Sequence, residues 1–184
     1  MFNYRLGGET ELRLLEERHA TELFALINRN RERLLVWVPW LDEAASLEHT
    51  RNFIRRKLQR FVDNNGFAAG IWDKGRLVGE IKIEYIDWPN SVTEIGYWLD
   101  TRTEGQGVVT KACRVLIAHA FNELALNRVQ IRCASENVRS RAIPERLGFR
   151  QEGVIRQVER LKDRYVDLVI YGMLASEWQV TVDR

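Results

Sequence analysis

Three strand-like segments follow one another in the middle of this 184-residue chain, with only short turns between them. The segments cover residues 67–72, 76–86 and 92–99. Their connections, Asp-Lys-Gly and Asp-Trp-Pro-Asn, are rich in turn-forming residues. Parallel neighbours need a crossover of a dozen or more residues, so connections this short favour antiparallel pairing. The middle of the chain is therefore predicted to form an antiparallel meander.

Apolar periodicity predicts further elements on both sides of this meander. They are a strand over 10–14, helices over 21–35 and 46–61, a helix from residue 107, a strand over 129–134, a short helix over 140–147 and two final strands that turn at 162–164. The sequence contains no repeat, linker or low-complexity tract. We therefore expect one α+β domain over residues 1–184.

Composition restricts the class of protein but not its activity. A net charge of +2 gives no general argument for nucleic-acid binding, and we expect no direct contact with nucleic acid. No run approaches the roughly 20 apolar residues of a membrane helix, and the N-terminus lacks a signal pattern. Two cysteines are too few for a disulfide scaffold. We expect a cytoplasmic protein without membrane contact.

The segment over residues 94–121 carries the strongest chemical signal. A strand is followed by a turn containing Gly105 and Gly107, and then by an amphipathic helix. Glycines let the backbone approach a ligand closely, and free N–H groups at a helix start suit a phosphate or pyrophosphate. Lys111 follows Thr110 instead of preceding it, so a P-loop fits poorly, and so does a dinucleotide fingerprint. A plain tight turn remains the alternative.

This strand, turn and helix resemble the acetyl-CoA-binding motif of the GNAT N-acetyltransferases, Gln/Arg-x-x-Gly-x-Gly/Ala. The segment CASENVRSRAIPERLGFRQEG resembles the second half of the family signature. Together with IGYWLD and GQG, it is similar to the RimJ/RimL branch, which acetylates N-terminal amines of ribosomal proteins. The resemblance extends from ELRLLEERHA to the last strand. It implies the GNAT fold, a mixed but mostly antiparallel sheet flanked by helices.

Two alignments of the coenzyme motif are open. Read literally, it begins at Arg102; read from the strand and helix, it places Glu104, Gly107 and Val109 at its first, fourth and sixth positions. We prefer the second, although it puts an acid and a valine where the family has other residues. A carboxylate would repel pyrophosphate, so we expect Glu104 to contribute only its backbone N–H. The coenzyme-binding residues that the resemblance implies are Tyr97, Trp98, Leu99, Glu104, Gly105, Gln106, Gly107, Val108, Val109, Thr110 and Asn137.

Acetyl transfer needs a base for the amine, an acid for the departing thiolate and a donor for the carbonyl oxygen. By resemblance, a backbone N–H within 97–99 is that donor, Ser140 is the acid and Glu159 is the base. Simpler alternatives exist: Ser140 as the N-cap of the short helix, a turn-forming Asn137 and a solvated Glu159. The rival carboxylates on the meander strands are those of Glu80, Glu84 and Glu94.

The resemblance also places Trp37 and Trp40 at the substrate entrance, with plain core packing as their alternative. Cys133 ends a strand near the expected site of the coenzyme thiol, so a reactive role for the Cys133 thiol is a further alternative. The three histidines lack the spacing of metal ligands, so no metal is expected.

The sequence therefore predicts an acetyl-CoA-dependent N-acetyltransferase that acts by direct attack in a ternary complex. Its expected acceptor is a protein N-terminus, and the resemblance also suggests a homodimer. Two alternatives remain: a small amine such as a polyamine, amino acid or aminoglycoside as acceptor, and a coenzyme-A-binding module without catalysis.

Overall fold

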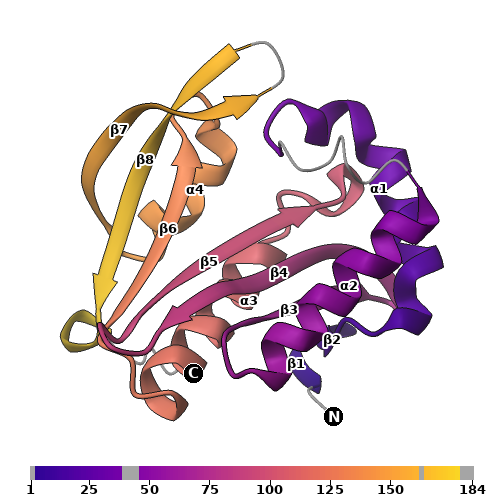
Figure 1. Ribbon diagram of the computed structural model, residues 1–184, viewed down its shortest axis with the longest axis horizontal. Helices are drawn as coiled ribbons and strands as arrows, with labels where there is room; N and C mark the ends of the chain where they lie inside the picture. The colour runs from indigo at the N-terminus through magenta and orange to yellow at the C-terminus, as the bar shows by residue number, and fades with distance from the viewer. Residues whose placement is uncertain (1–2, 39–45, 162–163, 179–184) are drawn as a thin grey trace.

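The computed structural model describes residues 3–38, 46–161 and 164–178, which build one eight-stranded sheet (Figure 1). The strand order is β1-β2-β3-β4-β5-β6-β8-β7. The strands are β1 (Asn3–Gly7), β2 (Thr10–Leu14), β3 (Phe67–Asp73), β4 (Arg76–Asp87), β5 (Val92–Leu99), β6 (Arg128–Ala134), β7 (Arg150–Leu161) and β8 (Arg164–Leu174). All neighbours pair antiparallel except β5 and β6. The predicted α+β class and the central meander are confirmed.

In the part of the chain that the structure describes, four α-helices cover the two faces of the sheet. Helices α1 (Ala20–Leu35) and α2 (Leu47–Val62) pack together on one face, in front of the sheet in Figure 1. Helix α3 (Val108–Ala118) lies behind it, and α4 (Val138–Arg146) packs on β6 and β7. Alternate residues of the central strands supply the two cores, because successive side chains of a strand point to opposite faces. No helix in the described residues is both long and apolar enough to span a membrane.

The predicted elements agree with the structure except at the N-terminus and at α4, which begins at Val138 instead of the predicted residue 140. Strand β1 is absent from the prediction, because its side chains are mostly exposed and it therefore lacks the alternation that marks a half-buried strand. The start of α2 agrees with the predicted helix over 46–61, because Ser46 is the residue just before the helix. The Ser46 hydroxyl accepts a hydrogen bond from the His49 N–H at 3.2 Å, which is an N-cap.

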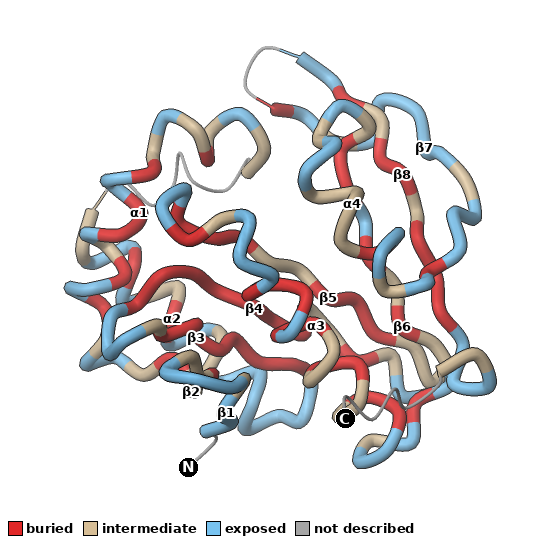
Figure 2. The backbone as a smooth tube through the Cα atoms, turned by 180° about the vertical axis from the view of Figure 1, so that it is seen from behind, coloured by how far each residue is buried: buried red, intermediate tan, exposed pale blue. Residues whose placement is uncertain are grey.

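The feature that positions the site is the short pairing of β5 with β6. These parallel strands pair only over Val92–Glu94 and Arg128–Gln130, and beyond these residues they diverge (Figure 1). The rest of β5, over 95–99, pairs with β4 alone among the described strands. Figure 2 shows the contrast between the buried central strands and the exposed edge strand β7. The sheet is therefore open between β5 and β6.

Candidate active site

The diverging ends of β5 and β6 line a cavity of about 1520 Å³. Its walls come from α1, β4, β5, the loop before α3, β6, α4 and β7. Pockets for one small molecule measure roughly 300–1000 Å³. The cavity therefore has room for two substrates at once.

One wall of the cavity is the start of α3. Gly107 precedes the helix with φ 73°, and Gly105 has φ 78°. A Cβ added at either glycine would meet nothing within 4 Å, so both stand next to open space. The first N–H groups of a helix have no partner inside the helix, and Val108, Val109 and Thr110 line the cavity. This arrangement fits a pyrophosphate.

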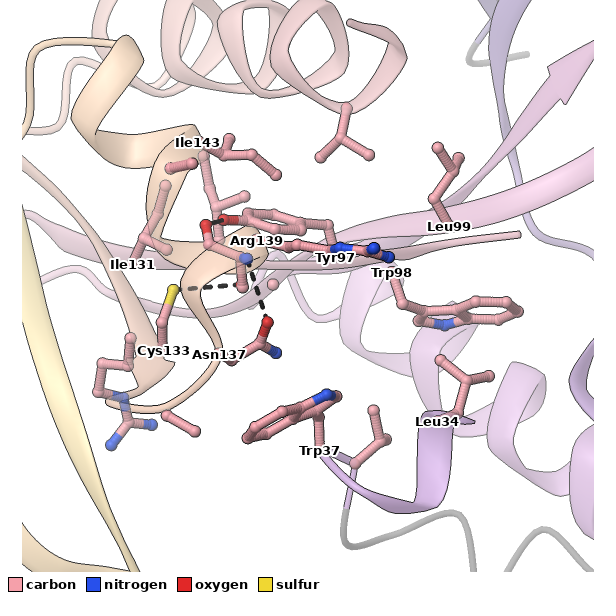
Figure 3. Close-up of a pocket in the computed structure, with 18 of the residues that line it drawn as sticks. Leu34, Trp37, Tyr97, Trp98, Leu99, Ile131, Cys133, Asn137, Arg139 and Ile143 are labelled. Carbon is pink, nitrogen blue, oxygen red and sulfur yellow. Dashed lines mark hydrogen bonds between the residues drawn. The ribbon is translucent and has the colours of Figure 1, made fainter. Parts of the chain in front are cut away.

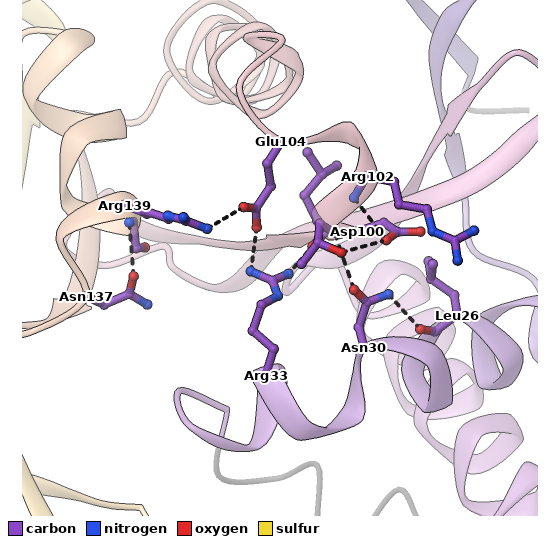
Figure 4. Close-up of polar contacts among 11 residues, drawn as sticks. Leu26, Asn30, Arg33, Asp100, Arg102, Glu104, Asn137 and Arg139 are labelled. Carbon is purple, nitrogen blue, oxygen red and sulfur yellow. Dashed lines mark hydrogen bonds and ion pairs between the residues drawn. The ribbon is translucent and has the colours of Figure 1, made fainter.

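Glu104 departs from our expectation that it contributes only its backbone N–H. That N–H donates to the Thr101 carbonyl at 3.4 Å, whereas the carboxylate makes the stronger contacts. One carboxylate oxygen accepts from Arg33 of α1, and the other accepts from Arg139 of α4 at 2.9 Å (Figure 4). Arg33 also donates to the Leu99 carbonyl. Two guanidinium groups therefore offset the negative charge that the sequence placed in the phosphate loop.

Ser140 contacts three polar side chains of the cavity wall, those of Tyr97, Cys133 and Asn137, which Figure 3 labels. Its hydroxyl oxygen is 3.3 Å from the Cys133 sulfur, and its N–H donates to the Asn137 side chain at 3.1 Å. The Tyr97 hydroxyl donates to the Ser140 carbonyl at 2.9 Å. The reading of Ser140 as an N-cap is wrong, because α4 begins at Val138 and Asn137 is the capping residue. The Ser140 hydroxyl is therefore not used to cap α4.

Burial raises the pKa of the Cys133 thiol, so it is a protonated thiol near neutral pH. Burial also holds the pKa of Tyr97 well above its usual value. Neither group is an anion in the cavity.

Glu159 of β7 reaches the cavity in a half-buried position. Its main chain pairs with Val166 of β8, whereas its carboxylate makes no hydrogen bond or ion pair with the described residues. Burial raises the pKa of its carboxyl group, against the opposing effect of the Arg132 charge. A carboxyl group with a raised pKa and no fixed partner is suited to accept a proton.

The three rival carboxylates are each held by other groups. Glu80 is fully buried outside the cavity lining, and the Trp98 indole donates to it at 3.1 Å. Glu84 lies between Lys57 at 2.8 Å and Lys82 at 2.6 Å. Glu94 accepts from Arg132 at 2.8 Å and from Gln130 at 3.0 Å. The second oxygen of Glu80 has no hydrogen-bond partner among the described residues, but Glu80 does not line the cavity. Of the four carboxylates, Glu159 is therefore the one that both lines the cavity and is left available by these contacts.

The tryptophans divide between core and cavity. Trp98 packs into the α1–α2 core, so only its main chain is suited to contact a coenzyme. Trp37 lines the cavity and packs against the cluster of Leu161, Val166 and Leu168. Trp40 lies outside the described residues.

The remaining predicted coenzyme residues line the cavity, with one exception. Gln106 is exposed and does not contribute to the wall. Among the described residues, no cluster of three or more histidine, cysteine or acidic side chains could hold a metal ion. Sequence reasoning missed Arg33 and Arg139, because no local pattern links Arg33 to a residue 71 positions away.

Comparison with known proteins agrees with this geometry. Residues 10–150 match the family model described as an acetyltransferase (GNAT) domain. The chain belongs to the GNAT acetyltransferase family. Its enzyme class is therefore that of the acetyltransferases, as the sequence resemblance implied.

Two curated relatives of this GNAT acetyltransferase match along nearly their whole length. The chain is 40% identical over 180 residues to the putative ribosomal N-acetyltransferase YdaF of Bacillus subtilis (strain 168), covering 97% of this chain and 98% of that protein. It is 32% identical over 172 residues to the ribosomal-protein-serine acetyltransferase of Escherichia coli (strain K12), covering 92% and 95%.

A solved structure shares the fold. RimL, a ribosomal L7/L12 alpha-N-protein acetyltransferase, superimposes on this GNAT chain with a TM-score of 0.91 and 26% identity, covering 94% of this chain and 98% of RimL. That structure is a complex with coenzyme A, which is joined to a cysteine by a disulfide.

Proposed function

We propose that this GNAT acetyltransferase transfers the acetyl group of acetyl-CoA to the N-terminal α-amine of a ribosomal protein, by direct attack in a ternary complex. The observation that carries the proposal is one cavity lined both by the start of α3 and by Glu159. The relatives named for ribosomal-protein acetylation support the choice of acceptor. One domain then holds both substrates.

The coenzyme side of the cavity fits acetyl-CoA. The N–H groups of Val108, Val109 and Thr110 bind the pyrophosphate, and Asn137 binds the coenzyme arm. The open edge of β5, over 95–99, pairs with the peptide-like pantetheine as it would with an added strand. Acetyl-CoA supplies an activated acetyl thioester. A backbone N–H within Tyr97–Leu99 donates to its carbonyl oxygen as negative charge develops there.

Two side chains move the protons. The Glu159 carboxylate accepts a proton from the acceptor amine, whose pKa of roughly 8 leaves much of it protonated at neutral pH. The Ser140 hydroxyl donates a proton to the departing thiolate. Tyr97 and Asn137 hold the main chain of Ser140 from both sides, so its hydroxyl is positioned before any substrate binds.

The acceptor side differs in character from the coenzyme side. Trp37 offers an aromatic face, and Arg132 and Glu94 form an ion pair along the same wall. Such a mixture of aromatic and paired polar groups suits the first residues of a peptide. No metal takes part in this mechanism.

We also propose that the enzyme is a cytoplasmic homodimer. Two observations support this. Edge strand β7 exposes Val154, Ile155 and Val158 by 45–48%, an unusual apolar content for a free sheet edge. Both cysteines are free thiols, as in a reducing compartment. Analytical ultracentrifugation at micromolar concentration tests the dimer.

The function is tested by measuring thiol release from acetyl-CoA with two acceptor panels. One holds peptides with different free N-termini, including ribosomal-protein N-termini, and each peptide is matched by an N-terminally blocked copy. The other holds polyamines, amino acids and aminoglycosides. We expect release with free peptides alone. Turnover of small amines only, or coenzyme binding without any turnover, would contradict the proposal.

A further inference from the structure

Strand β7 contains a bulge next to the residue that we propose as the base. Ile155 pairs with Leu168, but the next pair joins Glu159 to Val166. Four steps along β7 therefore match two steps along β8, so β7 holds two extra residues. Bulges re-aim side chains and are common beside active sites.

The bulge decides which residue faces the cavity opposite Val166. In a regular ladder continued from the Ile155–Leu168 pair, Gln157 would stand opposite Val166, and Glu159 would lie two residues further along. Two residues of a strand span about 7 Å. Cross-strand partners share a face, and Val166 packs with Leu168 and Trp37 at the cavity. Without the bulge, a neutral amide would replace the carboxylate.

The backbone of the bulge is held by one side chain of the neighbouring strand. Gln157 has φ 49°, a left-handed conformation that is costly for a residue other than glycine. Its N–H donates to the Asp167 carboxylate at 2.8 Å. The Asp167 carbonyl accepts from the Ser135 N–H at 2.9 Å, in the loop that leads to Ser140. Asp167 therefore joins the strand of Glu159 to the loop of Ser140.

We propose that Asp167 is a positioning residue, whose side chain holds the bulge in β7 that places Glu159 in the cavity. This inference rests on the proposed role of Glu159. Asp167 acts through the Gln157 backbone and touches neither substrate. Its loss lets β7 slip toward the regular register, with Gln157 at the cavity.

The test uses the full chain and steady-state acetylation of an accepted peptide. Asp167→Ala is expected to lower kcat by about tenfold or more, with the KM for acetyl-CoA unchanged. The fall of kcat at acid pH, which we attribute to protonation of Glu159, should also become smaller in this variant. Asp167→Asn keeps an oxygen that accepts from Gln157, so it should retain kcat within about threefold. The groups facing Glu159, Arg132 and Glu94, are unaltered in both variants.

A deletion distinguishes register from general stability. Removing Arg156 and Gln157 gives a regular ladder in which Glu159 still pairs with Val166. In that background Asp167→Ala should no longer lower kcat. Asp73→Ala is the matched control, because Asp73 accepts a hydrogen bond of the same 2.8 Å length from Thr10, far from the cavity. It should leave kcat unchanged.

The outcomes separate this inference from the proposed function. Normal kcat and a normal acid limb in Asp167→Ala overturn the inference and leave the role of Glu159 intact. If Asp167→Ala fails to fold, the deletion combined with Asp167→Ala decides: restored activity supports the inference, and an inactive folded protein overturns it. Full activity of Glu159→Gln removes the proposed base, and the inference falls with it.

Discussion

The Glu104 carboxylate accepts a hydrogen bond from Arg139 at 2.9 Å, and this contact links the phosphate loop to α4. Arg33 occupies the other carboxylate oxygen. Three charged side chains from distant parts of the chain therefore meet at the mouth of the cavity. Their net charge is positive, although the loop itself carries an acid.

Glu104→Gln should tighten coenzyme A binding about fivefold, which corresponds to about 1 kcal/mol. The substitution frees two guanidinium groups for the phosphates of the coenzyme. The gain should shrink at 1 M salt, because surface charges are then screened. Isothermal titration calorimetry of coenzyme A binding at low and high salt measures both effects.

The control is Glu48→Gln on α2, since Glu48 also pairs with two arginines, Arg51 and Arg55, away from the cavity. Unchanged affinity in Glu104→Gln would contradict this account.

Gly107→Ala should abolish measurable coenzyme binding at concentrations that saturate the parent protein. The added methyl group enters the open space next to the α3 N-terminus. The left-handed backbone should also lower the free energy of unfolding by about 1 kcal/mol. Gly75→Ala is the matched control, because Gly75 has the same φ of 73° and equal free space in the β3–β4 turn. Both variants should lose similar stability, and only Gly107→Ala should lose binding; equal binding in the two would place the phosphates elsewhere.

Ser140→Ala should lower kcat by about a hundredfold while the KM for acetyl-CoA stays within about twofold. The melting temperature should fall only slightly: the substitution removes the contact of the Ser140 hydroxyl with Cys133, whereas the contacts of Ser140 with Asn137 and Tyr97 use its main chain. Steady-state kinetics and thermal melts check the two expectations. Ser135→Ala, in the same loop but outside the cavity wall, serves as control. A normal kcat in Ser140→Ala would show that another group protonates the departing thiolate.

Glu159→Gln should remove the acid limb of the kcat–pH profile and also stabilise the fold near neutral pH. The pKa of Glu159 is raised in the folded protein by burial, so folding favours its protonated form. Its stabilising contribution is complete below the unfolded pKa and is lost as pH rises through the folded pKa. The variant should therefore melt higher than the parent at pH 8, and the difference should disappear toward about pH 4. A lower melting temperature at pH 8 would show that the charged carboxylate has a stabilising partner.

Much of the fold could be predicted because its signals are local. Turn residues between strands, a serine before α2 and glycines before α3 each act on their own neighbours. Strand β1 was not predicted, because an exposed edge strand has no buried face that requires alternating apolar and polar residues. The alternative role of Ser140 as the helix cap was wrong, because α4 begins at Val138 and Asn137, three residues before Ser140, is the cap.

The sequence by itself determined the order of the elements from β2 onward, the antiparallel meander and the glycine-containing start of α3, since periodicity and turn chemistry depend on neighbouring residues. Only the tertiary structure decided which charges meet. Arg33 reaches Glu104 across 71 positions, and Glu80, Glu84 and Glu94 are held by partners while Glu159 is not. The bulge that sets the register of Glu159 depends on Asp167 of the next strand. Such contacts are long-range, and burial and register arise only when the strands are packed together.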